Sequence, residues 1–369
     1  MPPATTPMED ERAPASGLAA RADEAVRTLT PGYFAAVMAT GIVSVATQLK
    51  GWASLSAALL VIAIAIYAIL ILLSIVRVVR HHDAVRSDLA DPRRAFGSFT
   101  FVAATCVLGS RIGTGPPHAT TVVLLAVATM TWVVLGYTLP WTAVLGRDER
   151  PLLHTADGTW FIWVVASQSI AVLAATLEVE LPAARSPLAV VAVVSWSVGA
   201  FLYGAVGVFV SLRLLVHPLR PVDLIPPYWV SMGATAITVV AGSRIVGMAD
   251  APMVDATRGL IAGTSVFFWA FGTWLIPPLV IGGYWRHVRH RVPLRYEPGL
   301  WSVVFPLGMY GVGARLLGHA DRLPLVEAIG DAECWVALTA WALTFVAMLV
   351  HLWRTIVRPT PLSEDPVSG

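Results

Sequence analysis

Three arginines occupy equivalent places in a repeated pattern of apolar, glycine, small, arginine and apolar residues. The pattern occurs at 108–112, 241–245 and 312–316, which places the arginines at Arg111, Arg244 and Arg315. Each arginine follows an aromatic residue by 14 or 15 positions, which is roughly 22 Å of helix at ~1.5 Å per residue. We therefore expect the three side chains at one depth. Around a pore they would form an outer collar that attracts anions and repels cations.

A competing interpretation is that these arginines pair with acidic residues on the same side and only hold loops in place. The acidic residues considered as partners are Asp250, Asp255, Asp321 and Glu333. The sequence leaves both interpretations open.

Uncharged polar side chains in the middle of apolar stretches form a second candidate set. Hydroxyls and amides can donate hydrogen bonds to an anion without the desolvation cost of a fixed charge. The predicted pore-lining residues are Thr40, Ser44, Thr105, Ser167, Gln168 and Thr238. Hydrogen bonding between helices is the alternative role for each of them.

A phenylalanine–proline pair marks a candidate gate. Pro306 lies inside an uncharged stretch, where a proline removes an intrahelical hydrogen-bond donor and kinks the helix. Phe305 precedes it directly and could project from the kink into the axis of a pore. From the residues alone, packing is the default role of a phenylalanine in an apolar chain.

The sequence contains no arrangement typical of a catalytic, metal or cofactor site. It has no P-loop, no HExxH motif, no nucleophile elbow, and no histidine pair spaced for haem or a metal. Its two cysteines, Cys106 and Cys334, lack metal-ligand spacing. We therefore predict a protein that is not an enzyme and that carries no metal and no cofactor.

The amino-acid composition indicates which kind of structure positions these residues. Of 369 residues, 13% are charged and 56% are hydrophobic, and the mean hydropathy is +0.71. Soluble domains carry roughly a quarter charged residues, so a soluble enzyme is excluded and the lipid bilayer must cover most of the surface. The formal net charge of +2 and the absence of a basic patch argue against nucleic acid as a partner.

Uncharged stretches close to the ~20 residues that cross a bilayer indicate the transmembrane helices. They lie at 28–49, 51–76, 95–110, 112–146, 158–177, 186–212, 224–243, 259–285, 298–314 and 334–353. The odd-numbered stretches are shorter, open with aromatic residues and are richer in glycine and polar residues. We predict an all-α integral membrane protein with ten transmembrane helices in five hairpins, in which the odd helices are protected and the even helices face lipid.

The distribution of basic residues predicts the orientation. Eighteen of the 25 Lys and Arg residues fall on the side of the termini and seven on the other side. By the positive-inside rule both termini are cytoplasmic, in a multi-pass protein of the cell inner membrane. The predicted organisation is a disordered cytoplasmic tail at 1–30, a transmembrane domain at 31–357 and a short cytoplasmic tail at 358–369.

Three segments resemble signatures of the tellurite-resistance/dicarboxylate transporter family, which includes TehA-type proteins, slow anion channels and malate permeases. Residues 31–42 resemble its opening helix, 158–165 its fifth helix and 301–307 its ninth helix. The resemblance implies a quasi-fivefold arrangement whose inner odd helices line a central pore, and a homotrimer with one pore in each protomer. It also implies that Phe305 matches the occluding phenylalanine of the family. One departure is Trp163, where many members have proline.

Three functions remain open at this stage. The first is an anion channel or facilitator that passes small inorganic or carboxylate anions down their gradient. The second is a proton-coupled transporter of C4-dicarboxylates such as malate, or of sulfite or tellurite. The third, a membrane anchor of a redox enzyme, would require intramembrane histidine pairs that the sequence lacks.

Overall fold

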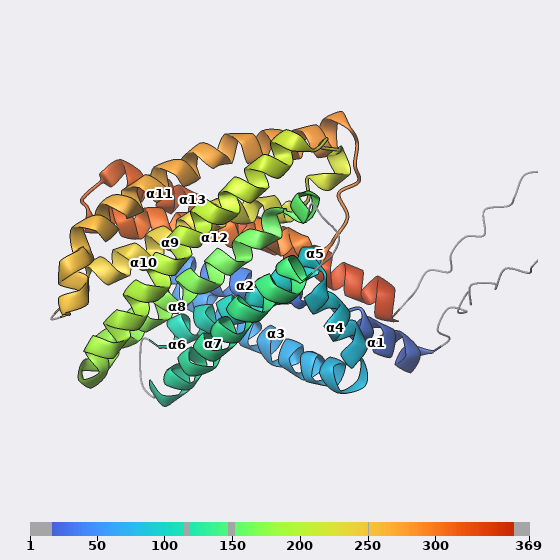
Figure 1. Ribbon diagram of the computed structural model, residues 1–369, viewed down its shortest axis with the longest axis horizontal. Helices are drawn as coiled ribbons and strands as arrows, with labels where there is room; N and C mark the ends of the chain where they lie inside the picture. Colours follow the sequence, from blue (N-terminus) through green and yellow to red (C-terminus); the bar gives the residue numbers. More distant parts are fainter. Residues whose placement is uncertain (1–16, 114–117, 147–151, 250, 358–369) are drawn as a thin grey trace, which may run out of the picture.

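In a computed structural model, the chain forms a bundle of helices (Figure 1). The structure describes residues 17–113, 118–146, 152–249 and 251–357. Ten segments in this part of the chain are long and apolar enough to cross a membrane. Secondary structure there is entirely helical, with no strand among the described residues. The predictions of an all-α membrane protein and of ten transmembrane helices are confirmed.

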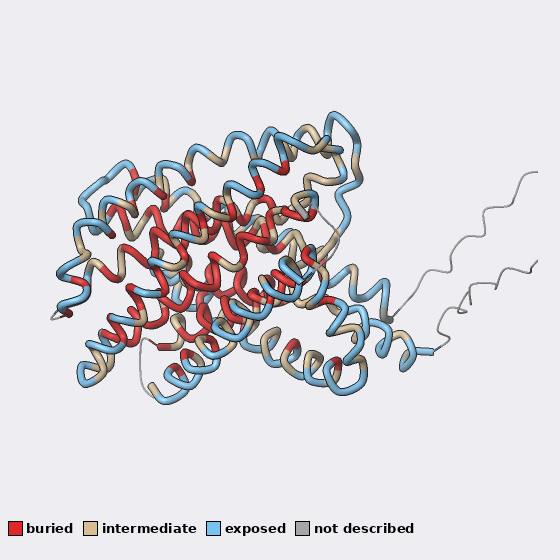
Figure 2. Tube along the Cα trace, in the orientation of Figure 1, coloured by how far each residue is buried: buried red, intermediate tan, exposed pale blue. Residues whose placement is uncertain are grey.

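The ten helices alternate between an inner and an outer set. The inner helices are α2 (Ala35–Leu49), α6 (Phe99–Ile112), α8 (Phe161–Glu180), α10 (Val230–Val246) and α12 (Trp301–Ala320). The outer helices are α3 (Ala53–Arg80), α7 (His118–Leu139), α9 (Arg185–Val216), α11 (Pro252–Tyr284) and α13 (Pro324–Leu352). In the inner spans 67–89% of the most apolar window is buried, against 11–44% in the outer spans. Figure 2 shows the same division, with buried residues along the central helices.

The inner helices form a closed ring. In chain order each packs against the next, and α12 returns to pack against α2. Each inner helix begins with a short 3-10 turn that carries an aromatic residue or, in α12, directly precedes one, and these five turns also contact one another in a closed order. The turns are η1 (Pro31–Phe34), η2 (Phe96–Ser98), η5 (Gly158–Trp160), η8 (Pro226–Trp229) and η10 (Pro298–Leu300). Quasi-fivefold symmetry is a stricter property than this ring and stays a prediction.

Glycines allow the inner helices to approach closely. A Cβ added to Gly308 of α12 would lie 2.8 Å from Ile42 Cγ2 of α2, and one added to Gly41 would lie 2.6 Å from Val107 Cγ1 of α6. Distances this short are below the contact that real Cβ atoms make, so a side chain at either position would separate two neighbours in the ring.

The described ends of the chain meet at one end of the bundle, where α1 (Leu18–Arg27) contacts the last helical turn, η11 (Trp353–Val357) (Figure 1). The helix α1 differs from the disordered tail expected at 1–30. It is held because Arg77 Nε donates a hydrogen bond to the carbonyl of Arg27 at 3.1 Å, and His81 lies 3.2 Å from Asp23. Residues 1–16 and the predicted tail 358–369 lie outside the described residues.

Candidate functional site

A small cavity of about 40 Å³ lies inside the ring and is walled by all five inner helices. It is large enough for one water molecule or a small ion. Its walls are mostly apolar. The lining residues are Ile42 and Val45 of α2, Cys106, Val107 and Ser110 of α6, Ser169 and Val172 of α8, Ile237, Val240 and Arg244 of α10, and Met309 and Val312 of α12. Because Ser110 and Arg244 belong to the last turns of their helices, the cavity lies toward the end opposite the termini.

Arg244 is the one charged residue among those that line the cavity. It forms no ion pair with a carboxylate in the described part of the chain, and its Nε is buried without a hydrogen-bond partner. The hydroxyl of Ser110, which also lines the cavity, is likewise buried and unpartnered. The cavity therefore presents a positive charge and a free donor that the protein itself does not satisfy.

The structure places the other two arginines of the repeat against protein groups. Arg111 donates to the hydroxyls of Ser44 and Ser56, at 3.1 and 2.9 Å. Arg315 forms an ion pair with Asp331, which also pairs with Lys50 at 3.0 Å. Neither arginine lines the cavity.

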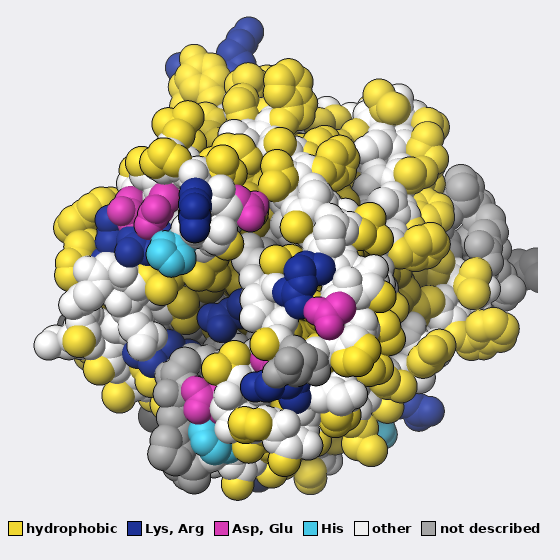
Figure 3. Space-filling model, turned by 90° about the vertical axis from the view of Figure 1, so that its left-hand side faces the viewer, with side chains coloured by type: hydrophobic (Ala, Val, Ile, Leu, Met, Phe, Trp, Pro, Cys, Tyr) yellow, Lys and Arg dark blue, Asp and Glu magenta, His cyan; other side chains and the backbone are white. Residues whose placement is uncertain are grey.

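Charged side chains nevertheless gather on the end of the molecule opposite the termini. Figure 3 shows Lys, Arg, Asp and Glu side chains there, among uncharged ones. The structure thus brings only Arg244 to the cavity and leaves Arg111 and Arg315 toward its periphery.

The six polar residues predicted to line a pore all have hydrogen-bond partners in the protein, and none lines the cavity. Thr40 accepts a hydrogen bond from Trp341 Nε1 at 3.0 Å, and Thr105 Oγ1 lies 2.8 Å from the Tyr67 hydroxyl. The other interhelical partners are Ser56 for Ser44, Trp132 for Ser167 and the Trp196 carbonyl for Gln168, whereas Thr238 donates within its own helix to Ala234. These geometries correspond to the helix-to-helix alternative for five of the six.

Ser110 and Ser169 are the polar cavity residues that the predicted set omits. Ser110 is the small residue of the arginine repeat, and Ser169 directly follows the predicted Gln168. Arg111, next to Ser110, and Gln168, next to Ser169, do not line the cavity, because adjacent residues on a helix face different directions. A helical projection of each odd span could have found them.

Phe305 is buried, with 1% of its surface exposed, and lies one helical turn from the cavity residue Met309. It precedes Met309 by four residues and Val312 by seven, so the three share one face of α12. Met309 and Val312 line the cavity, and Phe305 therefore lies on the same side of the helix, nearer the termini. Pro306 packs instead toward α10, because a Cβ on Gly233 would lie 2.7 Å from its Cγ.

Trp163, the residue at which the fifth-helix motif departs from the family, packs against two phenylalanines. Its ring stacks on Phe99 with centroids 5.8 Å apart and also contacts Phe96. It lies between α8 and α6 rather than in the cavity, so the larger side chain fills a helix interface.

At the end that carries the termini, charged groups hold the loops that join the helices. Asp157 accepts hydrogen bonds from the Thr159 amide and hydroxyl at 2.8 and 2.6 Å, and burial raises the pKa of its carboxyl. Asp223 pairs with Arg220 at 3.0 Å and lies 3.7 Å from Arg213. The described residues contain no group of three or more His, Cys, Asp or Glu placed to hold a metal ion.

Ten membrane-spanning helices, five of which enclose a common cavity, define a multi-pass membrane protein of the channel and transporter class. The comparison with known proteins gives the family. Residues 28–349 match the SLAC1 family, described as voltage-dependent anion channel, and the chain belongs to this family. The resemblance to tellurite-resistance/dicarboxylate transporters is thereby confirmed.

Relatives extend over most of the chain. An uncharacterized membrane protein of Mycobacterium tuberculosis is 70% identical over 158 residues, which cover 43% of this chain and 80% of the relative. Two uncharacterized transporters of Methanocaldococcus jannaschii are each 23% identical, over 87% of this chain and 92% or 94% of their own lengths.

Proposed function

We propose that the protein is an anion channel or facilitator that passes small anions down their electrochemical gradient through the centre of the inner ring. The observation that carries this proposal is the cavity walled by all five inner helices, in which Arg244, whose Nε has no hydrogen-bond partner, is the one charged residue among the described lining residues. A fixed positive charge in an apolar constriction stabilises an anion and repels a cation.

The cavity chemistry supports passive transport rather than proton coupling. Intramembrane proton relays use Asp, Glu or His side chains. The residues that line the cavity include none of these three types. A passive pathway needs only an electrostatic well and a hydrogen-bond donor, which Arg244 and Ser110 supply.

Phe305 is proposed as the gate of this pathway. Its place on the same face of α12 as the cavity residues Met309 and Val312 supports that role. An aromatic ring across the axis would exclude water and leave an ion without donors to replace its hydration.

We also propose the membrane location, the orientation and the oligomeric state of the protein. The distribution of basic residues supports an inner-membrane location with cytoplasmic termini. The exposed apolar surface of the outer helices supports contact with lipid and with further copies of the chain in a homotrimer, one pore in each.

Anion flux into proteoliposomes, measured with and without an imposed pH gradient, tests the proposal. We expect flux that follows the anion gradient and is indifferent to the pH gradient. Concentrative uptake driven by protons would support the competing carrier of dicarboxylate, sulfite or tellurite ions instead.

A further inference from the structure

A second cavity, the lateral groove, lies outside the ring and shares no lining residue with the central cavity. It has a volume of about 1010 Å³ and runs between α9, α11 and α13. Its floor is formed by the first turns of α8, α10 and α12. This volume is at the upper end of the roughly 300–1,000 Å³ that small-molecule sites occupy.

The groove is open because glycines leave its walls without side chains. Gly204 and Gly207 of α9 and Gly283 of α11 all line it, and a Cβ added to any of them would meet nothing within 4 Å. The remaining wall is largely aliphatic and aromatic. In a bilayer such a surface is covered by hydrocarbon, because water is absent from the bilayer core and contact between water and apolar side chains is unfavourable.

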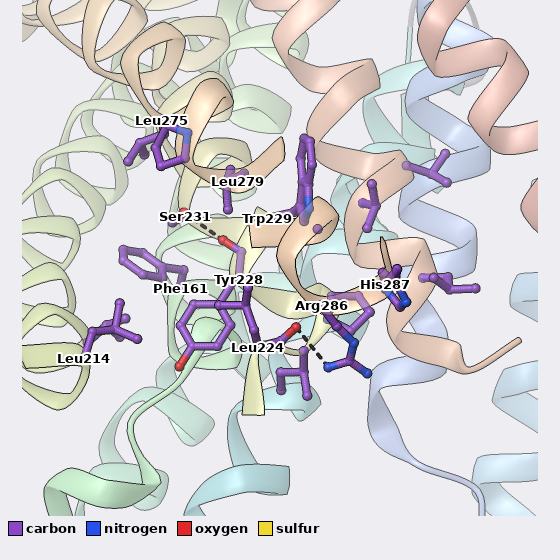
Figure 4. A pocket seen from close by; sticks show the side chains of 18 of the residues that line it. Phe161, Leu214, Leu224, Tyr228, Trp229, Ser231, Leu275, Leu279, Arg286 and His287 are labelled. Atoms are coloured by element: carbon purple, nitrogen blue, oxygen red, sulfur yellow. Dashed lines mark hydrogen bonds between the residues drawn. The ribbon is translucent and has the colours of Figure 1, made fainter. Parts of the chain in front are cut away.

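One end of the groove is basic, and the described residues that line it include no Asp or Glu. Figure 4 shows Arg286 and His287 together at this end, with Leu275 at the other. Arg295 lines the same groove, is exposed and has no carboxylate partner in the described part of the chain. Arg286 and His287 lie in the last turns of the eighth span, Pro252–Arg289, and Arg295 lies between it and the ninth span, at the end of the bundle that carries the termini.

The guanidinium of Arg286 is fixed but not neutralised. One of its terminal nitrogens donates to the carbonyls of Val222 and Leu224, each at 3.0 Å. Its Nε is buried and has no hydrogen-bond partner. The protein therefore orients a positive charge at the rim of an apolar groove, and no carboxylate in the described part of the chain forms an ion pair with it.

We propose that the lateral groove binds an anionic phospholipid of the leaflet on the side of the termini. The phosphate lies at Arg286 and Arg295, and an acyl chain runs along the groove past Gly207 toward Leu275. Basic pockets between transmembrane helices are suited to acidic headgroups, and Arg pairs closely with phosphate oxygens. The described residues that line the groove include three basic side chains and no acidic one, so charge complementarity favours an anionic lipid headgroup at this rim.

The groove lies against the helical turn of α12 that carries Phe305. Val303 and Val304 form part of its floor, and Phe305 follows them directly in α12. An acyl chain in the groove therefore packs against the same helical turn that carries the phenylalanine. Lipid binding is measured without transport, so its test does not depend on the proposed channel function.

The test measures lipid retention by native mass spectrometry. Delipidated protein is mixed with phosphatidylglycerol or with phosphatidylcholine of the same acyl chains. We expect one phosphatidylglycerol per chain to be held preferentially. Arg295→Gln should weaken its binding about tenfold, the effect of losing ~1.4 kcal/mol. The matched control is Arg289→Gln, which removes an exposed charge from the end of the preceding helical segment and does not line the groove.

A second pair of variants tests the groove itself. Gly207→Leu adds a side chain to open space in the groove, whereas Gly263→Leu makes the same change on α11 outside it, also in open space. Both should fold, and only Gly207→Leu should lose the retained lipid. Equal retention of the two lipids, or variants that bind as wild type does, would overturn the proposal. A change in subunit stoichiometry with unchanged lipid retention would also overturn it and would make the groove an interface between copies.

Discussion

Replacing Arg244 with glutamine removes the positive charge from the central cavity while keeping an amide donor and much of the side-chain volume. An anion in a space of about 40 Å³ lies within about 4 Å of the guanidinium. At that distance, with an effective dielectric constant of about 20, the attraction is about 4 kcal/mol. If a third of it survives the cost of removing water from the anion, conduction falls about tenfold in the variant.

The assay is anion flux in proteoliposomes, normalised to folded protein and measured at low and high salt. The control is Arg322→Gln, which removes an exposed charge from the same end without changing the cavity. Exposed charges are screened with a Debye length of about 10 Å at 0.1 M, so any effect of the control should vanish at high salt. The Arg244→Gln effect should persist. Flux within twofold of wild type in folded Arg244→Gln protein would refute the role of this charge.

Three further results are expected from other parts of the ring and its loops. Phe305→Ala should raise anion flux strongly with a modest loss of stability if the ring faces the pathway; loss of about 3–5 kcal/mol of stability with no gain in flux would show that it is core packing. Gly308→Leu should lower the melting temperature, because its side chain collides with Ile42; an unchanged melting temperature would contradict the close packing. The hydrogen bond from Arg220 holds the pKa of Asp223 below its usual value, so this pair stabilises the fold above about pH 4 and the stabilisation disappears as the pH falls through the folded pKa. Melting temperatures of wild type and Asp223→Asn should therefore converge on acidification, and parallel profiles would contradict the linkage.

The fold was readable from the sequence because it depends on local patterns. Each inner helix opens with an aromatic residue in a 3-10 turn or directly after one, and the spacing of those aromatics predicted the hairpin repeat. The short odd stretches are rich in glycine, and positions such as Gly41 and Gly308 show why: they allow ring helices to touch. The division into inner and outer helices follows directly from this difference in composition.

The candidate site was less readable because it depends on partners distant in sequence. Arg111, Arg244 and Arg315 are equivalent in the repeat, yet Asp331 on α13 neutralises Arg315 and hydroxyls of the first hairpin bind Arg111. No local pattern distinguishes Arg244 from the other two. Its difference arises from what the neighbouring helices leave unpaired.

The rotation of each helix was the other missing information. Gln168 and Ser169 are adjacent, but Gln168 bonds to the Trp196 carbonyl of α9 while Ser169 lines the cavity. Polarity and depth are the same for both residues. Only the packing of the ring decides which of them faces its centre.

The reversal potential of the reconstituted protein tests the central claim, passive anion conduction, most directly. Phe305→Ala, the variant expected to conduct strongly, is placed in a planar bilayer with a tenfold gradient of potassium chloride or potassium nitrate. A perfectly anion-selective pathway reverses at the anion equilibrium potential, about 59 mV in magnitude, and remains there when a pH gradient is added. A reversal potential near zero, of the cation sign, or moving with the pH gradient would contradict a passive anion pathway through this ring.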